Sequence, residues 1–224
     1  MKKTFKFIST ILLFTFFFGC SGVKVLDAWK SDTASEMRDN NILVIARTAN
    51  NQARIAFESE ITKQLTASGF KATSSYSVFP ANLNPEKELT EQQKTNFTAF
   101  LKNEGYDGIV LTVVKDYQES TRTTTDGGYY AGGTYSAYYP MYYGGFYGYY
   151  HHPYSYSTFG SYTPSTTTTS TVKTFILESV AYDLTQADGK QLAAVVTTKI
   201  EDPKDVTKNA KEYTKKITEA LQNK

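Results

Sequence analysis

The cysteine and histidine residues are the first candidates for chemistry, because thiols and imidazoles act as nucleophiles, bases and metal ligands. The chain of 224 residues has one cysteine, Cys20, and two adjacent histidines, His151 and His152. Neighbouring side chains on a strand point in opposite directions, and no further ligand motif lies nearby. The histidine pair therefore predicts no metal site. A single cysteine also excludes an internal disulfide.

Carboxylate pairs and glycine-rich segments give no stronger case for catalysis. Glu58 and Glu60 lie two positions apart in a predicted helix, so their side chains diverge and indicate a solvated face. Arg54 and Glu58 are four positions apart, which predicts a surface ion pair worth about 0.2–0.5 kcal/mol. The glycine pairs lack the lysine of a phosphate-binding loop, so neither a nucleotide nor any other cofactor is expected. We expect a non-enzymatic protein, with an envelope hydrolase as the least favoured alternative.

The first twenty residues have the pattern of an export signal. Three lysines within the first six residues precede an apolar stretch over residues 7–18, and Cys20 follows directly after Gly19. A twelve-residue helix reaches about 18 Å, short of a hydrocarbon core of roughly 30 Å. Residues 1–19 are therefore expected to be a signal peptide that is removed. Without its lysines the net charge falls to about −1, which argues against a nucleic-acid partner.

The FFGC motif at residues 17–20 resembles the lipobox of bacterial lipoproteins. In that family the thiol receives a diacylglycerol, the peptide is cut before the cysteine, and the new amine is often acylated. The resemblance implies acyl chains such as palmitate on Cys20, which would anchor the protein stably in a membrane. Ser21, a residue other than Asp, favours the outer membrane by the sorting rule of proteobacterial lipoproteins. The alternative is an ordinary secretion signal in which the cysteine falls there by chance.

Apolar patterning after the signal predicts one α/β domain. Residues 20–41 are expected to form an N-terminal tether with a first short strand, and residues 42–222 the domain itself. Strand and helix patterns follow in the order β-α-β-α-β-β-β-α, which predicts a mixed four- to five-stranded sheet packed by about three helices. The strands are expected at 42–46, 70–76, 109–125, 166–184 and 191–200, and the helices after N-terminal caps at Asn51, Thr90 and Asp202. Thr90 and Gln93 fit a capping box, and Gly69 is expected to end the first helix.

Two stretches of the domain carry a family resemblance. The run NILVIARTANNQARIAFESEITKQLTASGFKATSSYSVFP and the later FLKNEGYDGIVLTVV resemble a family of mostly uncharacterised bacterial envelope lipoproteins. They are more distantly similar to penicillin-binding-protein activator lipoproteins and to the curli-secretion lipoprotein. The resemblance covers about residues 40–125 and 170–222, and its marks are Arg-x-x-Phe-Glu at 54–58 and Gly-Tyr-Asp-Gly at 105–108. None of these is catalytic, so the resemblance implies a fold and a compartment.

A tyrosine-rich segment interrupts the predicted domain over residues 126–165. No Asp, Glu, Lys or Arg occurs from residue 127 through residue 172, and 13 of the 18 tyrosines fall within residues 127–162. Threonine-rich flanks predict two hairpin arms that carry the segment away from the sheet and its core. Its tip is expected to be a freely moving loop, a binding surface, or a contact with the lipid interface. The candidate binding residues are Tyr138, Tyr139, Tyr142, Tyr143, Tyr149 and Tyr150.

The sequence therefore favours a lipid-anchored, non-enzymatic protein of the bacterial cell envelope, held in the outer membrane through Cys20. It is expected to bind an envelope protein or polysaccharide through the aromatic loop. The alternative is a regulatory or assembly lipoprotein that contacts an envelope machine through the α/β domain, as the family resemblance implies. Asp32-Thr33-Ala34 also matches a short acceptor pattern of bacteroidete O-glycosylation, which makes Thr33 a candidate modification site.

Overall fold

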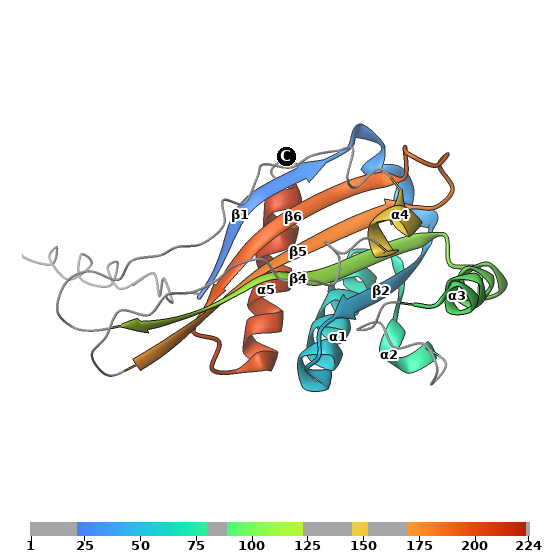
Figure 1. Cartoon of the computed structure of the whole chain (residues 1–224). Helices are drawn as coiled ribbons and strands as arrows, with labels where there is room; N and C mark the ends of the chain where they lie inside the picture. Colours follow the sequence, from blue (N-terminus) through green and yellow to red (C-terminus); the bar gives the residue numbers. More distant parts are fainter. Residues whose placement is uncertain (1–21, 80–88, 123–144, 152–169, 223–224) are drawn as a thin grey trace, which may run out of the picture.

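A single mixed sheet of six strands organises the protein (Figure 1). The computed structural model describes residues 22–79, 89–122, 145–151 and 170–222. The strand order is β1-β6-β5-β4-β2-β3, with β2 parallel to β3 and β4 and the other pairs antiparallel. The strands are β1 (Val23–Lys30), β2 (Asn41–Arg47), β3 (Lys71–Ser74), β4 (Gly108–Arg122), β5 (Ser170–Asp183) and β6 (Leu192–Glu201).

The helices complete the predicted α/β class. They are the 3-10 helix η1 (Asp32–Asp39) and the α-helices α1 (Asn51–Ala67), α2 (Ser75–Val78), α3 (Glu91–Asn103), α4 (Phe146–His151) and α5 (Val206–Gln222). The sheet has one strand more than expected, because the first short strand pairs with β6 and becomes part of it. Within the described ranges, no helix combines the length and apolar character needed to cross a bilayer.

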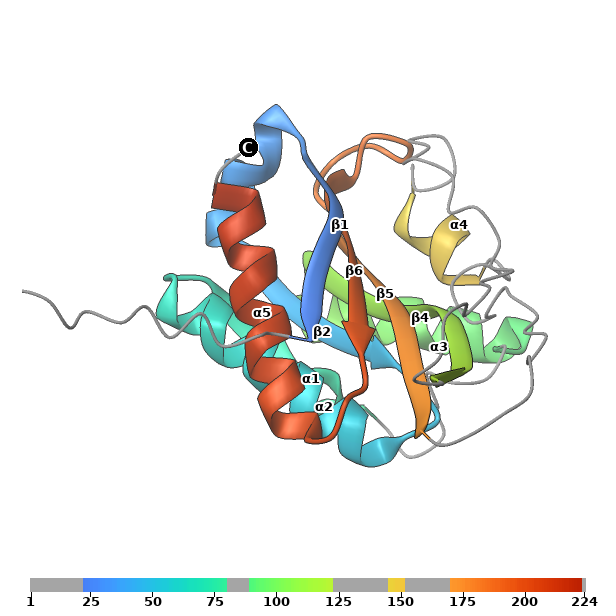
Figure 2. The same cartoon turned by 90° about the vertical axis from the view of Figure 1, so that its left-hand side faces the viewer.

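Two layers of helices cover the two faces of the sheet (Figure 2). Helices α1, α5 and η1 cover one face, here called the α5 face, and α3 and α4 cover the other, here called the α4 face. Alternate residues of β2 serve the two layers: Ile42 and Val44 join the core under α1 and α5, whereas Leu43 and Ile45 join the core under α3 and α4. The continuous apolar run of β2 reflects this burial on both sides.

Local capping signals fix the ends of α1 and α3. The Asn50 side chain accepts a hydrogen bond from the backbone N–H of Ala53, so the cap of α1 lies one residue before the expected Asn51. Gly69 follows α1 with a φ of 88°, a conformation that glycine adopts without strain. The predicted capping box of Thr90 and Gln93 is present at the start of α3.

The cap predicted for the last helix is wrong by one turn. Asp205, rather than Asp202, accepts a hydrogen bond from the backbone N–H of Lys208 at 2.9 Å. Asp202 instead lies in the connecting turn with a φ of 47°, and its backbone N–H donates to the Lys173 carbonyl oxygen of β5. The helix therefore starts at Val206, after a turn that fastens it to the sheet.

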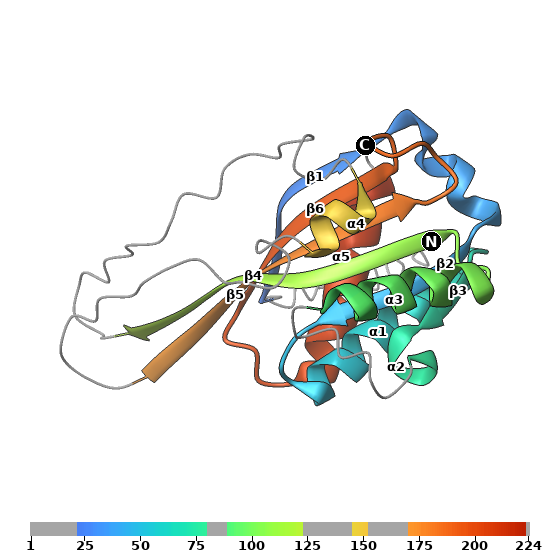
Figure 3. The same cartoon turned by 45° about the vertical axis from the view of Figure 1, so that its right-hand side comes forward.

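Strands β4 and β5 continue beyond the other strands as a two-stranded ribbon (Figures 1 and 3). Within β5, residues 170–173 pair only with β4, and pairing with β6 begins at Thr174. Thr121 and Thr171 lie opposite each other, which agrees with the predicted threonine-rich arms. The helix α4 lies back over the body of the sheet, away from the end of the ribbon.

The ion pair of Arg54 and Glu58 is buried, contrary to the expectation of a solvated face. Glu58 is 0% exposed, and Arg54 Nε lies 3.0 Å from its Oε1 atom. The same carboxylate accepts hydrogen bonds from the backbone N–H groups of Ala46 and Tyr76 and from the Ser75 hydroxyl. Glu58 thus joins α1 to the end of β2 and the start of α2. Sequence spacing showed the pair but not the three donors that surround it.

Candidate functional site

Aromatic side chains of α4 are buried against the α4 face of the sheet. Phe146, Tyr149 and Tyr150 are 0%, 2% and 1% exposed. The Tyr150 ring stacks on Phe97 of α3 at a centroid distance of 5.0 Å, and Phe146 meets the edge of Tyr182 at 5.6 Å. The expectation that the whole tyrosine-rich segment lies outside the core is therefore wrong for residues 146–150. These rings cover apolar residues of the sheet on a face where α4 is only about one and a half turns long.

Charged side chains also hold α4 against the sheet. Arg47 Nη1 donates to the Tyr150 carbonyl oxygen at 2.6 Å, and its guanidinium lies 4.3 Å from the centre of the Tyr150 ring. The Tyr149 hydroxyl donates to the Glu178 carboxylate, whose Oε1 is 3.1 Å from Lys115 Nζ. Burial lowers the pKa of Lys115, and Glu178 partly opposes that change. Tyr149 and Tyr150 are anchors of α4, so the prediction that they form an exposed binding surface is wrong.

The other predicted site residues are not gathered at one place. Cys20, His152 and four of the candidate tyrosines, Tyr138, Tyr139, Tyr142 and Tyr143, lie outside the described residues. His151 is half-buried at the end of α4, and Thr33 is exposed on η1. Among the side chains that the structure describes, no group of three or more His, Cys, Asp or Glu could hold a metal ion.

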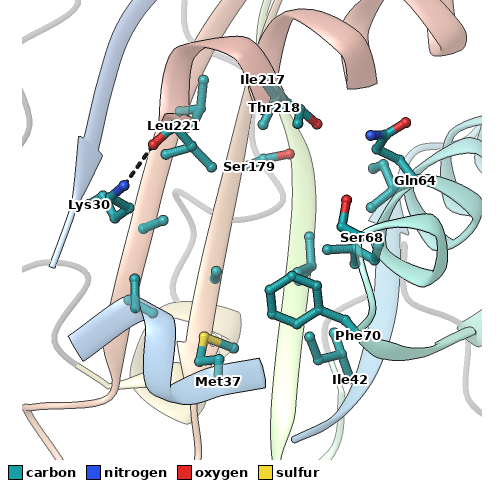
Figure 4. A pocket seen from close by; sticks show the side chains of 18 of the residues that line it. Lys30, Met37, Ile42, Gln64, Ser68, Phe70, Ser179, Ile217, Thr218 and Leu221 are labelled. Carbon is teal, nitrogen blue, oxygen red and sulfur yellow. Dashed lines mark hydrogen bonds between the residues drawn. The ribbon is translucent and has the colours of Figure 1, made fainter. Parts of the chain in front are cut away.

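A cavity of about 740 Å³ lies on the α5 face, between α1, α5, η1 and the sheet (Figure 4). Phe57 of α1 and Tyr213 of α5 touch edge to face, with ring centroids 5.1 Å apart. The lining residues of both helices begin beyond this contact, from Ile61 in α1 and from Thr214 in α5. The cavity is therefore a slot between the C-terminal halves of the two helices, on one side of the contact between the two rings.

A β-bulge leaves room at the floor of the cavity. Ala181 pairs with Ala194, whereas the next residue, Tyr182, pairs with Leu192, so Ala193 is an extra residue in β6. All three alanines line the cavity. A bulge allows two successive side chains to serve one face of a strand, and here both are methyl groups. Because these floor side chains are small, they leave space between the sheet and the two helices α1 and α5.

Apolar side chains form the walls, and the inner polar groups are already paired. Ile61 and Leu65 line the α1 side, and Ile217 lines the α5 side. Deeper in, the Ser179 hydroxyl lies 2.8 Å from the hydroxyl of Tyr213 and 2.6 Å from that of Thr112. Burial raises the pKa of Tyr213 to about 12, so its phenol is neutral at physiological pH. The interior lining is therefore uncharged and mostly apolar.

Charged and polar side chains gather at the outer part of the cavity. The charged lining residues are Lys30 at the end of β1 and Asp32 and Arg38 of η1. Lys30 Nζ donates to the Leu221 carbonyl oxygen at 2.8 Å, which satisfies a backbone acceptor at the end of α5. In the part of the chain that the structure describes, neither Lys30 nor Arg38 takes part in an ion pair.

Sequence reasoning did not find this cavity, because its lining comes from eight separate helices and strands. The predicted N-terminal tether over residues 20–41 contains η1, which places Met37 and Arg38 in the lining of the cavity. The one local signal is the Ala193-Ala194 pair, where a strand facing two large helices would ordinarily carry larger residues. Such a pair indicates missing volume only when the helices above it are known.

The sequence matches no protein-family model, and no curated protein matches it. Among solved structures it is similar to a PelC dodecamer from Paraburkholderia phytofirmans in space group P6, with 11% identity, a TM-score of 0.42, and coverage of 89% of this chain and 96% of that chain. A variant of that PelC dodecamer in space group C2 has the same identity and TM-score, with coverage of 90% and 98%. At this level of similarity, neither structure bears on the function of this chain.

Proposed function

We propose that this protein is a lipid-anchored, non-enzymatic binding protein of the bacterial cell envelope whose α/β domain holds an apolar ligand in the cavity on the α5 face. The observation that carries the proposal is the cavity of about 740 Å³ with its apolar walls. Ligand pockets of proteins span roughly 300–1,000 Å³ and combine apolar linings with a few polar groups. The alternative binding surface is the tyrosine-rich tip, but two of its candidate residues, Tyr149 and Tyr150, are buried in the core.

The anchor is the part of the proposal that rests on the sequence. The lipobox-like FFGC motif supports acylation of Cys20, and β1 begins at Val23, only three residues later. An acylated Cys20 would therefore hold the domain close to the outer membrane without a long linker. Substitution of Cys20 by Ala is expected to move the protein from the membrane fraction or to leave it unprocessed. An unmodified Cys20 on a mature chain, detected by mass spectrometry, would refute the anchor.

Photolabelling of the anchored protein tests the cavity. Isolated membranes that contain the full protein are treated with a neutral alkyl diazirine, and labelled peptides are mapped by mass spectrometry. Label is expected on the C-terminal halves of α1 and α5. The variant Ala194→Phe should lose most of it, because the added ring occupies the floor of the cavity. The control Ala67→Phe, at an exposed position of α1 outside the lining, should be labelled like the parent.

A second filling variant protects this test against misfolding. Leu65→Trp adds volume from the wall of α1 rather than from the sheet, so it does not depend on the β-bulge. Thermal unfolding identifies which variants are folded. Unchanged labelling in a folded Ala194→Phe or Leu65→Trp protein would exclude the cavity as the ligand site.

The ribbon favours a second candidate function, binding through the tyrosine-rich tip. Paired strands β4 and β5 carry the chain past the end of β6, with Thr121 opposite Thr171, so both strands meet the tyrosine-rich segment away from the core of the domain. An envelope protein or polysaccharide is the expected partner. Crosslinking and capture from intact envelopes should lose that partner when Tyr138, Tyr139, Tyr142 and Tyr143 are changed to Ser, with α4 left intact. A partner that is retained by this variant but lost from Ala194→Phe would point to the α/β domain, as expected for a regulatory or assembly lipoprotein.

A further inference from the structure

We propose that the ligand of the cavity is an amphiphile with an elongated apolar body and one anionic head group, held with its body between α1 and α5 and its head beside Lys30 and Arg38. This inference rests on the proposed function and names the ligand class of the same site. A fatty acid, with a carboxylate head, is the simplest member of the class. A lysophospholipid with a phosphate head shares the same chemistry.

The interior of the cavity requires an apolar ligand body. A polar group placed between α1 and α5 would lose its water and would need a new hydrogen-bonding partner, at a cost of about 1–3 kcal/mol. The hydroxyls of Ser179 and Tyr213 at the inner end already bond to each other. Alkyl groups can instead contact Ile61, Ile217 and the alanine floor, which offer no hydrogen-bonding side-chain atoms.

The form of the cavity favours an elongated body. Beyond one end of the slot Phe57 contacts Tyr213, and Lys30 and Arg38 lie on the elements at its other end. A ligand therefore has one end in an apolar environment and the other beside charged groups. This polarity along the slot is the pattern that an amphiphile matches.

The charges at the outer end favour an anionic head. Two cationic side chains and one carboxylate, Asp32, line this part of the cavity. Lys30 donates to the Leu221 carbonyl, but a neutral acceptor leaves the charge of the ammonium uncompensated. The end of α5 carries a partial negative charge of about half a unit, which compensates Lys30 only in part, so both Lys30 and Arg38 can attract an anion. A carboxylate placed there would face both cations beside low-dielectric walls, where their attraction is stronger than in bulk water.

Competition with the neutral photolabel distinguishes head groups at constant chain length. Hexadecanoic acid, its methyl ester, hexadecyltrimethylammonium and a hexadecanoyl lysophosphatidic acid are added to membranes that contain the full protein. The two anions are expected to displace the label at concentrations about tenfold below the ester, equivalent to about 1.4 kcal/mol, and the cation should be the weakest competitor. The relative potency of the acid and the phosphate identifies which anionic head the site prefers.

Variants at the outer end test the assigned contacts. The double variant Lys30→Met with Arg38→Met should reduce the tenfold preference for acid over ester to about one, while the neutral label still binds. Lys24→Met, an exposed position near the other end of β1, is the matched control and should keep the full preference. Equal potency of acid and ester in the parent, stronger competition by the cation, or a preference that survives the double variant would each overturn the anionic head. Loss of all labelling in the parent would instead refute the proposed function itself.

Discussion

The two faces of the sheet are covered by helices in different ways. On the α4 face, Phe97, Phe146, Tyr150 and Tyr182 contact one another and leave these rings at most 1% exposed. On the α5 face, two long helices lie over a floor of alanines and leave a cavity of about 740 Å³. The face with the shorter helix is the filled one, and the face with the longer helices is the open one. Helix length alone therefore does not decide how well a sheet is covered.

The difference shows which segment the fold requires and which space it leaves for function. The chain supplies its own filling for the α4 face by returning a six-residue helix from the tyrosine-rich segment. No comparable segment among the described residues enters the slot between α1 and α5. An apolar ligand in the slot, as proposed above, would add van der Waals contacts to the side chains that line it.

Removal of the tyrosine-rich segment is the largest test of this contrast. Replacement of residues 127–162 by Asn-Gly deletes α4 and exposes the apolar residues beneath it, including Leu111 and Val180. Loss of a single buried Phe typically costs about 3–5 kcal/mol, and three buried rings are lost here. We expect the free energy of unfolding to fall by more than about 5 kcal/mol, measured by urea denaturation. A cooperative transition at the parent midpoint would show that α4 is dispensable.

A substitution at Glu58 tests the junction of α1 with β2 and α2. Glu58→Ala removes the acceptor of four donors and leaves the Arg54 guanidinium, whose side chain is 14% exposed, without its carboxylate. Breaking a buried ion pair in this way costs about 3–5 kcal/mol. Urea denaturation at pH 7 measures the loss. The control Glu60→Ala, on the same helix and half-buried, should change stability by less than about 1 kcal/mol.

A matched pair of isoleucines compares the two faces directly. Ile45→Ala, on the α4 face, creates a void in a closed core and should cost about 3–4 kcal/mol, because Ile45 is 0% exposed. Ile217→Ala, on the wall of the cavity, enlarges a space that already exists and should cost about 1 kcal/mol. Chemical denaturation of the two variants gives the comparison. Equal losses would mean that the α5 face is as tightly filled as the α4 face.

The sequence predicted the features that depend on neighbouring residues. The apolar run of β2, the capping box of Thr90 and Gln93, and the stop at Gly69 each act within a few positions of the chain, and the structure has all three. The α/β class followed from the order of these elements. The predicted cap of α5 is misplaced because Asp202 and Asp205 both suit the position. The turn between β6 and α5, which is hydrogen-bonded to β5, decides between them.

Features that depend on distant residues were not predicted. Glu58 is buried because β2 and α2 bring their donors to it, and periodicity in α1 carries no information about them. The tyrosine-rich segment has too much glycine and too few aliphatic residues for a core of its own, yet its rings complete a core that β4, β5 and α3 begin. The cavity is likewise a property of the packed elements, since Ala193 and Ala194 become a floor only beneath α1 and α5.

The smallest expected effect concerns His151, at the exposed edge of the closed face. Burial, with the positive charges of Lys94 and Arg47, lowers the pKa of His151 from its ordinary value of 6.5 to about 4, and Glu91 opposes this only partly. Between these two pH values the unfolded chain holds a proton on His151 that the folded protein does not. The contribution of the neutral imidazole is therefore complete above pH 6.5 and is lost as the pH falls toward 4.

The change His151→Gln separates this contribution from that of the carboxylates, which also titrate near pH 4. Because His151 is only half-buried, solvent screens much of the effect, and the expected difference is a shift of a few degrees in the thermal midpoint. The midpoint of the parent should fall more steeply than that of the variant between pH 6.5 and pH 4.5, whereas above pH 7 the two curves should run parallel. If the two curves stay parallel down to pH 4.5, His151 is solvated in the folded protein, and the closed face ends at Tyr150.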